Sequence, residues 1–518
     1  MEQNAGNWDY EDASYANALS LNICTSATKG LEEIIKPNFG SCGTLKMLVS
    51  SLNDIKITKD GFILLKEMQI QNPVASLIAK SVCIQHYKMG DGATSIIIVI
   101  GNLFSQIEKY IERGIHPQIL QQGIDVAKRK LEKWLPSQII KLKLKRNNLI
   151  LLAKSILSTK LRKKFVFKMA TILSDALLTI YREKEEIDTE IIEIMPMDNQ
   201  TEMESRFIKG IVLDHGSRHM KMPTILNNVF ILLCNISLEY EKSEFDSEFV
   251  FNSENQQEKM FIKEREYIDR KVKKIIQLKR FVCKNEKRGF LVINQKGIDA
   301  SALDLFSREK ILAVRRAKRK NMERISLMCS ATPVNSVEDI KPEVLGYAGL
   351  VYEQSIDEEK YTFIENVSNP FSGTILVKGK NLLLKQQIKS TIKNTLTALK
   401  NFIKDKCALI GGGKVEISAY KCLIKYSETI RGRKKFGIIA LAKGIIGIPK
   451  TLSENSGEDP YEYFAKINQI SKNNLHLNTK YTKILDCFST KRKIYDIACT
   501  TVSSIMLIDE ILLGKGLN

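Results

Sequence analysis

The stretch Gly90-Asp91-Gly92-Ala93-Thr94-Ser95 holds residue types that could bind a phosphate group. Glycines let the backbone approach a ligand closely, and the first N–H groups of a helix that begins here would point at an anion. A carboxylate does not attract phosphate, so we expect Asp91 to hold a divalent metal ion on the phosphate oxygens. A simple turn and helix cap would have the same residue types. The phosphate interpretation therefore depends on the surrounding elements.

Helical periodicity surrounds this stretch on both sides. Apolar residues recur at helical spacing over residues 15–36, and Pro73 begins a second helix over residues 74–88. Residues 96–110 and 117–135 have the same periodicity. The first part of the chain is therefore predicted to be almost wholly α-helical.

A predicted hairpin would position a second carboxylate. Residues 46–51 and 54–58 are typical of two short strands joined at Leu52-Asn53, and they lead into Lys59-Asp60-Gly61. Asp60 would thus lie between a strand and a helix, where a functional carboxylate can be held rigidly. Upstream, Gly40 and Gly43 bound a turn with the freedom to wrap around a ligand.

In the middle of the chain the sequence pattern changes from helical periodicity to a mixture of strand-like and helical segments. Helical periodicity continues over residues 149–182, and short apolar runs then indicate strands at 191–195, 207–212, 229–233, 289–294, 346–353, 361–365 and 373–377. Residues 244–279 are densely charged at helical spacing, which is typical of a helix that projects from its domain or of a solvated surface helix. Residues 301–328 are predicted to form a helix or a helix pair.

The last part is predicted to be helical again, at residues 382–406, 415–426, 437–446 and 494–513. The first of these helices is expected to end in a second glycine cluster, Gly411-Gly412-Gly413. The simplest architecture is an α-helical domain formed by both ends of the chain, with α/β material inserted between them.

The length and the charge of the chain limit the classes of function that it can have. At 518 residues the chain is expected to form about three domains. The net charge of +20 would suit a nucleic-acid partner, but lysines are spread along the whole chain. The basic run from Arg315 to Lys320 is therefore interpreted as a charged helix face, and nucleic-acid binding is not favoured as the main function.

The cysteines and the apolar stretches of the sequence indicate in which cellular compartment the protein lies. Ten cysteines are scattered singly, without a CxxC pair or zinc-ligand spacing, which favours reduced thiols in a cytosolic type of compartment. Residues 1–10 lack the features of a signal peptide, and the apolar stretch 436–449 is too short to span a bilayer. We expect a cytoplasmic protein without a membrane segment.

These motifs resemble the group II chaperonins, the t-complex polypeptide 1 family, over essentially the whole chain. The nucleotide site of that family uses a GPKG loop, a TxDG turn, a GDGTT stretch, a GGG or GAG cluster and an Asp near the C-terminus. The matching stretches here are residues 40–43, 58–61, 90–95 and 411–413, together with Asp486. Residues 213–216, 234–241, 293–299, 313–324 and 345–353 further resemble one subunit type of the eukaryotic cytosolic chaperonin.

The resemblance implies a multi-domain α+β chaperonin fold. A mostly α-helical equatorial domain would comprise residues 1–146 and 404–518, and a small α/β intermediate domain residues 147–212 and 365–403. An α/β apical domain would comprise residues 213–364, with a helical lid protrusion at about 244–280. Two stacked rings of such subunits, forming a hetero-oligomer, would enclose unfolded client proteins and be driven by ATP and Mg²⁺.

The resemblance also implies roles for individual residues. Asp60 would help to position the attacking water, and Asp91 would be the Mg²⁺ ligand. The nucleotide would be bound by Gly40, Gly43, Asp60, Gly61, Asp91, Gly92, Ala93, Thr94, Ser95, Gly411, Gly412, Gly413 and Asp486.

Several positions depart from the family pattern. Ser41 and Cys42 replace Pro and Lys, so the first loop lacks a cation, and Ala93 replaces a Thr hydroxyl. Counted back from Gly411, the second water-activating Asp of the family falls on Asn394. An Asn side chain can accept a hydrogen bond but cannot take a proton as a carboxylate does.

Three functions therefore remain open. The first is an ATP-driven folding subunit, which Asp60 and Asp91 favour. The second is a structural ring subunit that binds ATP, hydrolyses it poorly and contributes a basic surface that orients clients, which Asn394 and Cys42 favour. The third, a basic RNA-binding scaffold, predicts nucleic-acid binding with a steep salt dependence.

Overall fold

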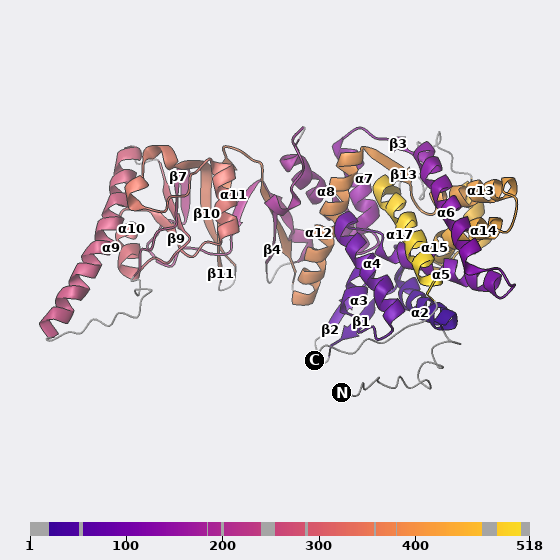
Figure 1. Ribbon diagram of the computed structural model, residues 1–518. Helices are drawn as coiled ribbons and strands as arrows, with labels where there is room; N and C mark the ends of the chain where they lie inside the picture. The colour runs from indigo at the N-terminus through magenta and orange to yellow at the C-terminus, as the bar shows by residue number, and fades with distance from the viewer. Residues whose placement is uncertain are drawn as a thin grey trace, which may run out of the picture. The chain divides into compact units, whose positions relative to one another are not determined.

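The computed structural model describes residues 20–50, 55–183, 185–197, 201–239, 254–284, 288–356, 359–379, 381–468 and 484–508. The chain forms two compact units (Figure 1). Unit 1 combines Met1–Ser174 with Gln386–Asn518, and unit 2 is Asp175–Lys385.

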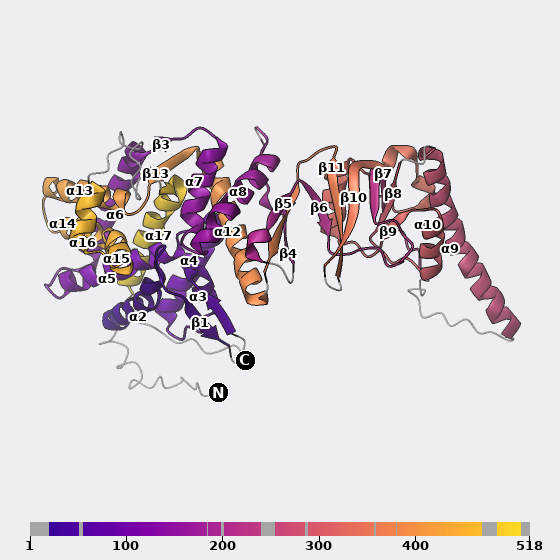
Figure 2. The ribbon, with the colours of Figure 1, turned by 180° about the vertical axis from the view of Figure 1, so that it is seen from behind.

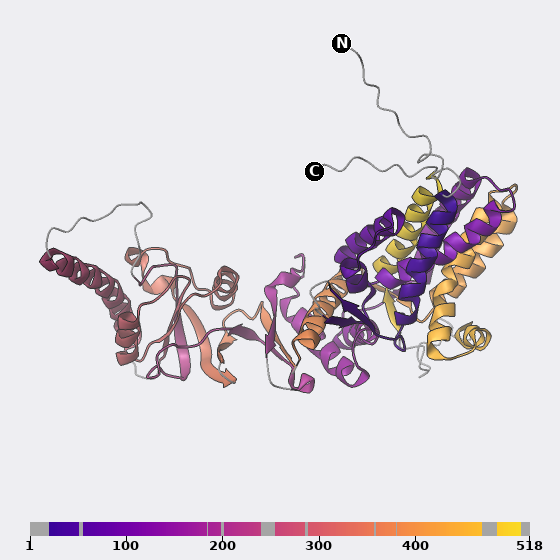
Figure 3. The ribbon, with the colours of Figure 1, turned by 90° about the horizontal axis from the view of Figure 1, so that it is seen from below.

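Unit 1 is built around helix α5 (Ala93–Ile111). Its residues Ile96, Ile97, Ile98, Val99 and Ile100 are all buried, as expected for a run that is apolar on every face of the helix and surrounded by other elements. It packs against α2 (Ser20–Ile35), α14 (Lys435–Ile445) and α17 (Phe488–Met506). Figure 3 shows early helices, in indigo and purple, interleaved with late helices in orange and yellow. Both ends of the chain thus share one hydrophobic core.

The remaining helices of unit 1 are α3 (Gly61–Glu67), α4 (Pro73–Met89), α6 (Pro117–Trp134), α7 (Arg146–Leu157), α13 (Lys414–Thr429), α15 (Gly447–Ser456) and α16 (Pro460–Asn468). Helices α8 (Lys163–Ile180) and α12 (Leu382–Asp405) continue from unit 1 into unit 2. The stretch Lys435–Ser456 is long and apolar enough to cross a membrane by length and composition, yet 67% of its most apolar window is buried in the protein. It is thus typical of core helices in a globular unit.

Two small sheets complete unit 1. Strands β1 (Lys46–Val49) and β2 (Ile55–Thr58) pair antiparallel, which confirms the predicted hairpin. The second sheet has the order β14-β13-β3, formed by Leu485–Cys487, Cys407–Ile410 and Ile140–Lys141. Our expectation that the helix over 382–406 runs directly into the glycine cluster was wrong, because β13 lies between them. That strand is only four residues long and its partners are distant in sequence, so local periodicity could not reveal it.

Unit 2 contains a six-stranded sheet in the order β6-β11-β10-β7-β8-β9. Its strands are β6 (Gly210–Leu213), β7 (Ile225–Cys234), β8 (Phe290–Asn294), β9 (Leu312–Val314), β10 (Gly346–Ile356) and β11 (Glu359–Val367). Strands β7, β8 and β9 are parallel, and the other pairs are antiparallel. The helices are α9 (Glu254–Val282), α10 (Ala300–Arg308) and α11 (Arg319–Cys329), and Figure 2 shows α9 beside α10. Residues 301–328 therefore contain a strand, β9, that the helical prediction missed.

A second sheet in unit 2 has three strands in the order β4-β12-β5. They are β4 (Ile192–Met197), β12 (Gly373–Lys378) and β5 (Arg206–Ile208). The run predicted as one strand at 207–212 is divided between β5 and β6, which belong to different sheets. The chain passes between them at Lys209, and at Gly210, the first residue of β6, a Cβ atom would lie 2.1 Å from the carbonyl oxygen of Ile364. Short 3-10 turns lie at Lys36–Asn38, Leu135–Gln138, Thr189–Ile191, Glu202–Glu204, Val337–Asp339 and Pro342–Val344.

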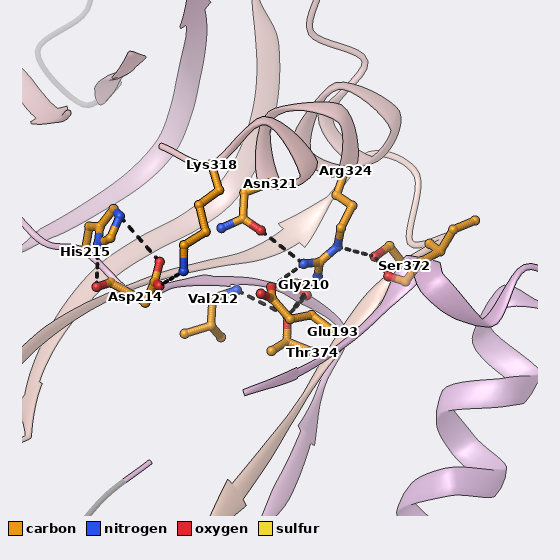
Figure 4. Close-up of polar contacts among 11 residues, drawn as sticks. Glu193, Gly210, Val212, Asp214, His215, Lys318, Asn321, Arg324, Ser372 and Thr374 are labelled. Carbon is orange, nitrogen blue, oxygen red and sulfur yellow. Dashed lines mark hydrogen bonds and ion pairs between the residues drawn. The ribbon is translucent and has the colours of Figure 1, made fainter. Parts of the chain in front are cut away.

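A buried arginine connects α11 to the three-stranded sheet (Figure 4). Arg324 forms an ion pair with Glu193 of β4 and donates to the hydroxyl groups of Ser372, 3.4 Å away, and Thr374, 3.2 Å away. Only 9% of the Arg324 side chain is exposed. This network fixes the middle of α11 against β4 and β12 by charge-assisted hydrogen bonds.

Candidate functional site

One pocket in unit 1 collects most of the predicted site residues. Its lining includes residues from five distant segments of the chain: Gly40, Asp60, Gly61, Asp91, Gly92, Ala93, Thr94, Ser95, Gly412, Gly413 and Asp486. Residues separated by more than 400 positions in sequence therefore face one space.

Gly43, Gly411 and Asn394 do not line this pocket but support it. A Cβ atom at Gly43 would lie 2.4 Å from the carbonyl oxygen of Asn38, so the turn needs glycine there. A Cβ atom at Gly411 would lie 2.9 Å from Oδ1 of Asp486. The amide nitrogen Nδ2 of Asn394 lies 3.5 Å from Oδ2 of Asp60. These three positions contact lining residues or shape the turn that carries them.

Two helices begin at the pocket without a side-chain cap. Gly92 precedes α5 with a φ of 94°, and Gly413 precedes α13 with a φ of 87°. Both values lie in the left-handed region, which glycine adopts readily. Because neither helix has a side-chain acceptor at its cap, its first N–H groups and the positive end of its dipole are available to an anion. The pocket therefore has two elements suited to phosphate oxygens.

The two predicted carboxylates lie on either side of a buried lysine. Asp60 caps α3 by accepting from the backbone N–H of Phe62 at 3.2 Å. Nζ of Lys160, which follows α7, lies 3.2 Å from Oδ2 of Asp60 and 4.0 Å from Oδ1 of Asp91. Only 7% of the Lys160 side chain and 6% of the Asp60 side chain are exposed. The acids thus share one cation.

Burial and this cation set the protonation states. Burial alone would raise the pKa of Asp60, but the Lys160 ammonium outweighs it and holds that pKa below its usual value. Asp91 keeps 37% of its side chain exposed, yet desolvation in the recess raises its pKa, against the effect of Lys160. Burial would lower the pKa of Lys160, but the two carboxylates together raise it. The pocket therefore favours a cation between the two acids.

The residues present fit a magnesium ion that is bound together with phosphate. The Lys160 ammonium shows that a cation is stabilised between Asp60 and Asp91. The described residues contain no cluster of three His, Cys, Asp or Glu side chains that could hold a metal by themselves. Mg²⁺ commonly uses one or two carboxylates and takes its other ligands from phosphate and water. Asp91 is suited to such a partial ligand set.

A second buried lysine supports Asp486. Nζ of Lys491, in the first turn of α17, lies 3.1 Å from Oδ2 of Asp486 and forms an ion pair with the fully buried Glu416. Burial lowers the pKa of Lys491, but Asp486 and Glu416 raise it well above its usual value. Asp486 is thus fixed at the pocket edge as an acceptor.

Sequence reasoning missed both lysines. Lys160 and Lys491 lie in no glycine-rich or acidic motif, and only the tertiary contacts bring them to the pocket. A third cation lies near the first loop, where Nζ of Lys59 donates to the carbonyl oxygen of Ser41 at 3.0 Å. Lys59 therefore places a positive charge beside the first loop, in which Cys42 replaces the lysine of the family pattern.

Comparisons with known proteins agree with the resemblance inferred from the motifs. Residues 31–515 match the TCP-1/cpn60 chaperonin family. The T-complex protein 1 subunit zeta-2 of Homo sapiens and that of Mus musculus are each 41% identical over 506 residues, covering 96% of this chain and 95% of each relative. Zeta is the subunit type that the five additional stretches indicated. Given this match, and a fold of helices with several sheets, the chain belongs to the TCP-1/cpn60 chaperonin family.

Proposed function

We propose that this chain is an ATP-binding chaperone subunit, similar to zeta, of a hetero-oligomeric double ring in the cytoplasm. Its partners would be other chaperonin subunits and the unfolded client proteins that the ring encloses. The observation that carries the proposal is the convergence of five distant segments on one pocket with two uncapped helix N-termini and the pair Asp60 and Asp91.

We assign the three expected domains to parts of the two units. The helical core of unit 1 would be the equatorial domain. The sheet β4-β12-β5 would belong to the intermediate domain, and the sheet that contains β7 to β10 would form the apical domain. Helix α9, with charged residues over most of its length, would be the lid protrusion. The separate cores of the helical unit and the six-stranded sheet support this division.

The pocket residues suggest how a triphosphate would be held. Backbone N–H groups at the start of α5, together with the hydroxyl groups of Thr94 and Ser95, would donate to phosphate oxygens. Asp91 would hold Mg²⁺, which when bound neutralises charge on the phosphate oxygens. Asp60 is rigid, ionised and close to Asp91, so it is suited to orient a water molecule. Asp486 would accept from the ribose or the base.

A second candidate function is a subunit that binds ATP but hydrolyses it slowly. Asn394 contacts Asp60 through its amide nitrogen, and it cannot accept a proton from water. Loss of a general base typically costs about 10²–10⁴ in rate. Such a subunit would act mainly as a structural ring member, and the net charge of +20 would provide a basic surface that orients acidic clients.

Nucleotide binding by the full-length chain tests the shared basis of both candidates. Equilibrium dialysis with labelled ATP and Mg²⁺ should show saturable binding that Asp91→Ala weakens by about tenfold or more, since one charge-assisted contact is worth that much. Asp339→Ala, an exposed position in unit 2, is the matched control and should bind as the unmodified chain does. Absence of binding, or equal affinities for all three proteins, would contradict the proposal.

A further inference from the structure

A buried histidine lines the pocket and has no place in the function described so far. His86 lies in the last turn of α4 and is 2% exposed. Its ring stacks on Phe62 with the centroids 4.3 Å apart and an angle of 14° between the planes. His86 also contributes to the pocket lining beside Asp60 and Lys160. The ring therefore has one face in the core and access to the pocket.

No hydrogen bond of good geometry joins either ring nitrogen of His86 to another residue that the structure describes, although the Asn394 side chain lies close enough to act on the ring. A neutral imidazole has one N–H donor and one acceptor nitrogen. Leaving such groups unsatisfied in the interior costs more than a hydrogen bond gains, so native sites of this kind are usually served by ordered water or a ligand. A phenylalanine would fill the same space without this cost. The nitrogens are thus suited to bond to a molecule in the pocket.

The groups around the ring determine which form it takes. Burial lowers the pKa of His86 to about 3, and the Lys160 ammonium acts in the same direction. Asp60 and the Asn394 side chain act the other way, without restoring the usual value. The imidazole is therefore neutral near pH 7, and one nitrogen can accept a hydrogen bond.

His86 also lies near Asn394, the position at which this chain lacks a carboxylate. The Asn394 amide directs its Nδ2 at Asp60, which leaves its second N–H and its carbonyl oxygen for other partners, and of these only the oxygen is an acceptor. Asp60 already accepts from the N–H of Phe62 and pairs with Lys160. A water molecule held beside Asp60 and Asn394 would thus find a further acceptor in the imidazole nitrogen.

We propose that His86 is a further catalytic residue, whose imidazole nitrogen accepts a hydrogen bond from the water that attacks the terminal phosphate of ATP. This inference rests on the ATP-binding function proposed above. In the step, the water oxygen forms a bond to the terminal phosphorus, and the bond from that phosphorus to the bridging oxygen breaks. ADP leaves with the electron pair, and the proton of the water ends on the released phosphate. His86 orients the water and does not retain the proton.

The test distinguishes the effect of the aromatic ring at position 86 from the effect of its hydrogen-bonding nitrogens. His86→Phe keeps an aromatic ring against Phe62 and removes both nitrogens, whereas His86→Gln restores one acceptor oxygen. Tyr87→Phe is the control, because Tyr87 contacts the edge of the same Phe62 ring but is 63% exposed. Each full-length protein is assayed for binding of labelled ATP by equilibrium dialysis. Single-turnover hydrolysis of the bound ATP is then measured with protein in excess.

We expect His86→Phe to bind ATP as the unmodified chain does and to hydrolyse it about tenfold more slowly, the value of one hydrogen bond. His86→Gln should recover part of the rate, and Tyr87→Phe should keep all of it. Equal single-turnover rates for His86→Phe and the unmodified chain would overturn the role of His86 while leaving the ATP-binding function intact.

The remaining outcomes are also decisive. Absence of ATP binding by the unmodified chain would refute the proposed function itself. Binding without any detectable hydrolysis would overturn the inference alone, since no reaction would then need His86. If His86→Phe does not fold, as judged by circular dichroism, His86→Leu, which also removes both nitrogens, takes its place. A His86→Leu rate below that of Tyr87→Phe with unchanged affinity supports the inference, and an equal rate contradicts it.

Discussion

Nζ of Lys160 lies 3.2 Å from Oδ2 of Asp60, and both side chains are more than nine-tenths buried. A buried ion pair is a weak source of stability, because desolvation of both charges offsets their attraction. Here the same ammonium also lies 4.0 Å from Asp91, so one cation acts on two pocket carboxylates. The pair therefore contributes to the charge balance of the pocket as well as to the packing around it.

Replacing Lys160 by Met should destabilise the chain strongly. The change leaves Asp60 buried without its charge partner, and breaking such a pair typically costs about 3–5 kcal/mol. Urea unfolding of the full-length variant should show this loss. Added Mg²⁺ should then raise the melting temperature of Lys160→Met more than that of the unmodified chain, because the ion can occupy the place of the ammonium.

The matched control is Lys164→Met, an exposed position four residues later. It removes the same charge from the surface, where ion pairs contribute about 0–1 kcal/mol. Equal losses for Lys160→Met and Lys164→Met, or no additional effect of Mg²⁺ on the former, would show that Lys160 does not hold the two carboxylates.

Restoring a carboxylate at position 394 should accelerate hydrolysis. Asn394→Asp places a proton acceptor beside Asp60, and we expect single-turnover hydrolysis to rise by about 10²-fold or more. The added negative charge also faces Asp60, so the variant without nucleotide should be less stable than the unmodified chain. Asn401→Asp on the same helix is the control, since Asn401 donates to the carbonyl oxygen of Lys88 outside the pocket. If Asn394→Asp and Asn401→Asp hydrolyse ATP at the same rate, Asn394 does not limit the chemistry.

Local patterns in the sequence predicted the elements that carry glycines and carboxylates. The hairpin before Asp60 and the helix that begins at Ala93 have strong short-range signals, and both are present. Strands β9 and β13 were missed because they are short and are stabilised by partners far away in the chain. Lys160 and His86 were missed for a related reason, since a lone lysine or histidine acquires a role only through tertiary contacts. The resemblance to a family located the pocket, but only the contacts showed how its charges are balanced.

The buried His86 should make stability depend on pH. Its pKa is about 3 in the folded chain against 6.5 when exposed, so the unfolded state binds more protons between these values. Stability should therefore fall as the pH drops below 6.5, by about 1.4 kcal/mol per pH unit from this group. His86→Phe removes that contribution. The free energy of unfolding, measured with urea, should fall between pH 7 and pH 5 by about 2 kcal/mol less for His86→Phe than for the unmodified chain.

The other pocket groups should not hide this difference. Lys160 and Asp60 act on His86 and are present in both proteins, so their own pH dependence largely cancels in the comparison, and the Asn394 amide does not titrate. The depressed pKa of Asp60 affects stability only as the pH falls below its ordinary range. Equal pH slopes for the two proteins would mean that His86 is not held neutral in the folded chain.

In unit 2, the ion pair of Arg324 and Glu193 allows a test of how much more a buried ion pair contributes to stability than an exposed one. Arg324→Met would leave Glu193 without its charge partner and the hydroxyl groups of Ser372 and Thr374 without their donor, at a cost of about 3–5 kcal/mol. Lys320→Met is the matched control, because Lys320 pairs with Glu190 where 83% and 68% of the two side chains are exposed. That change should cost at most about 1 kcal/mol. Because α11 contacts β4 and β12 through Arg324, limited proteolysis should cleave Arg324→Met faster than Lys320→Met near α11. Similar unfolding midpoints and cleavage rates for both variants would mean that Arg324 does not fix α11 to the sheet.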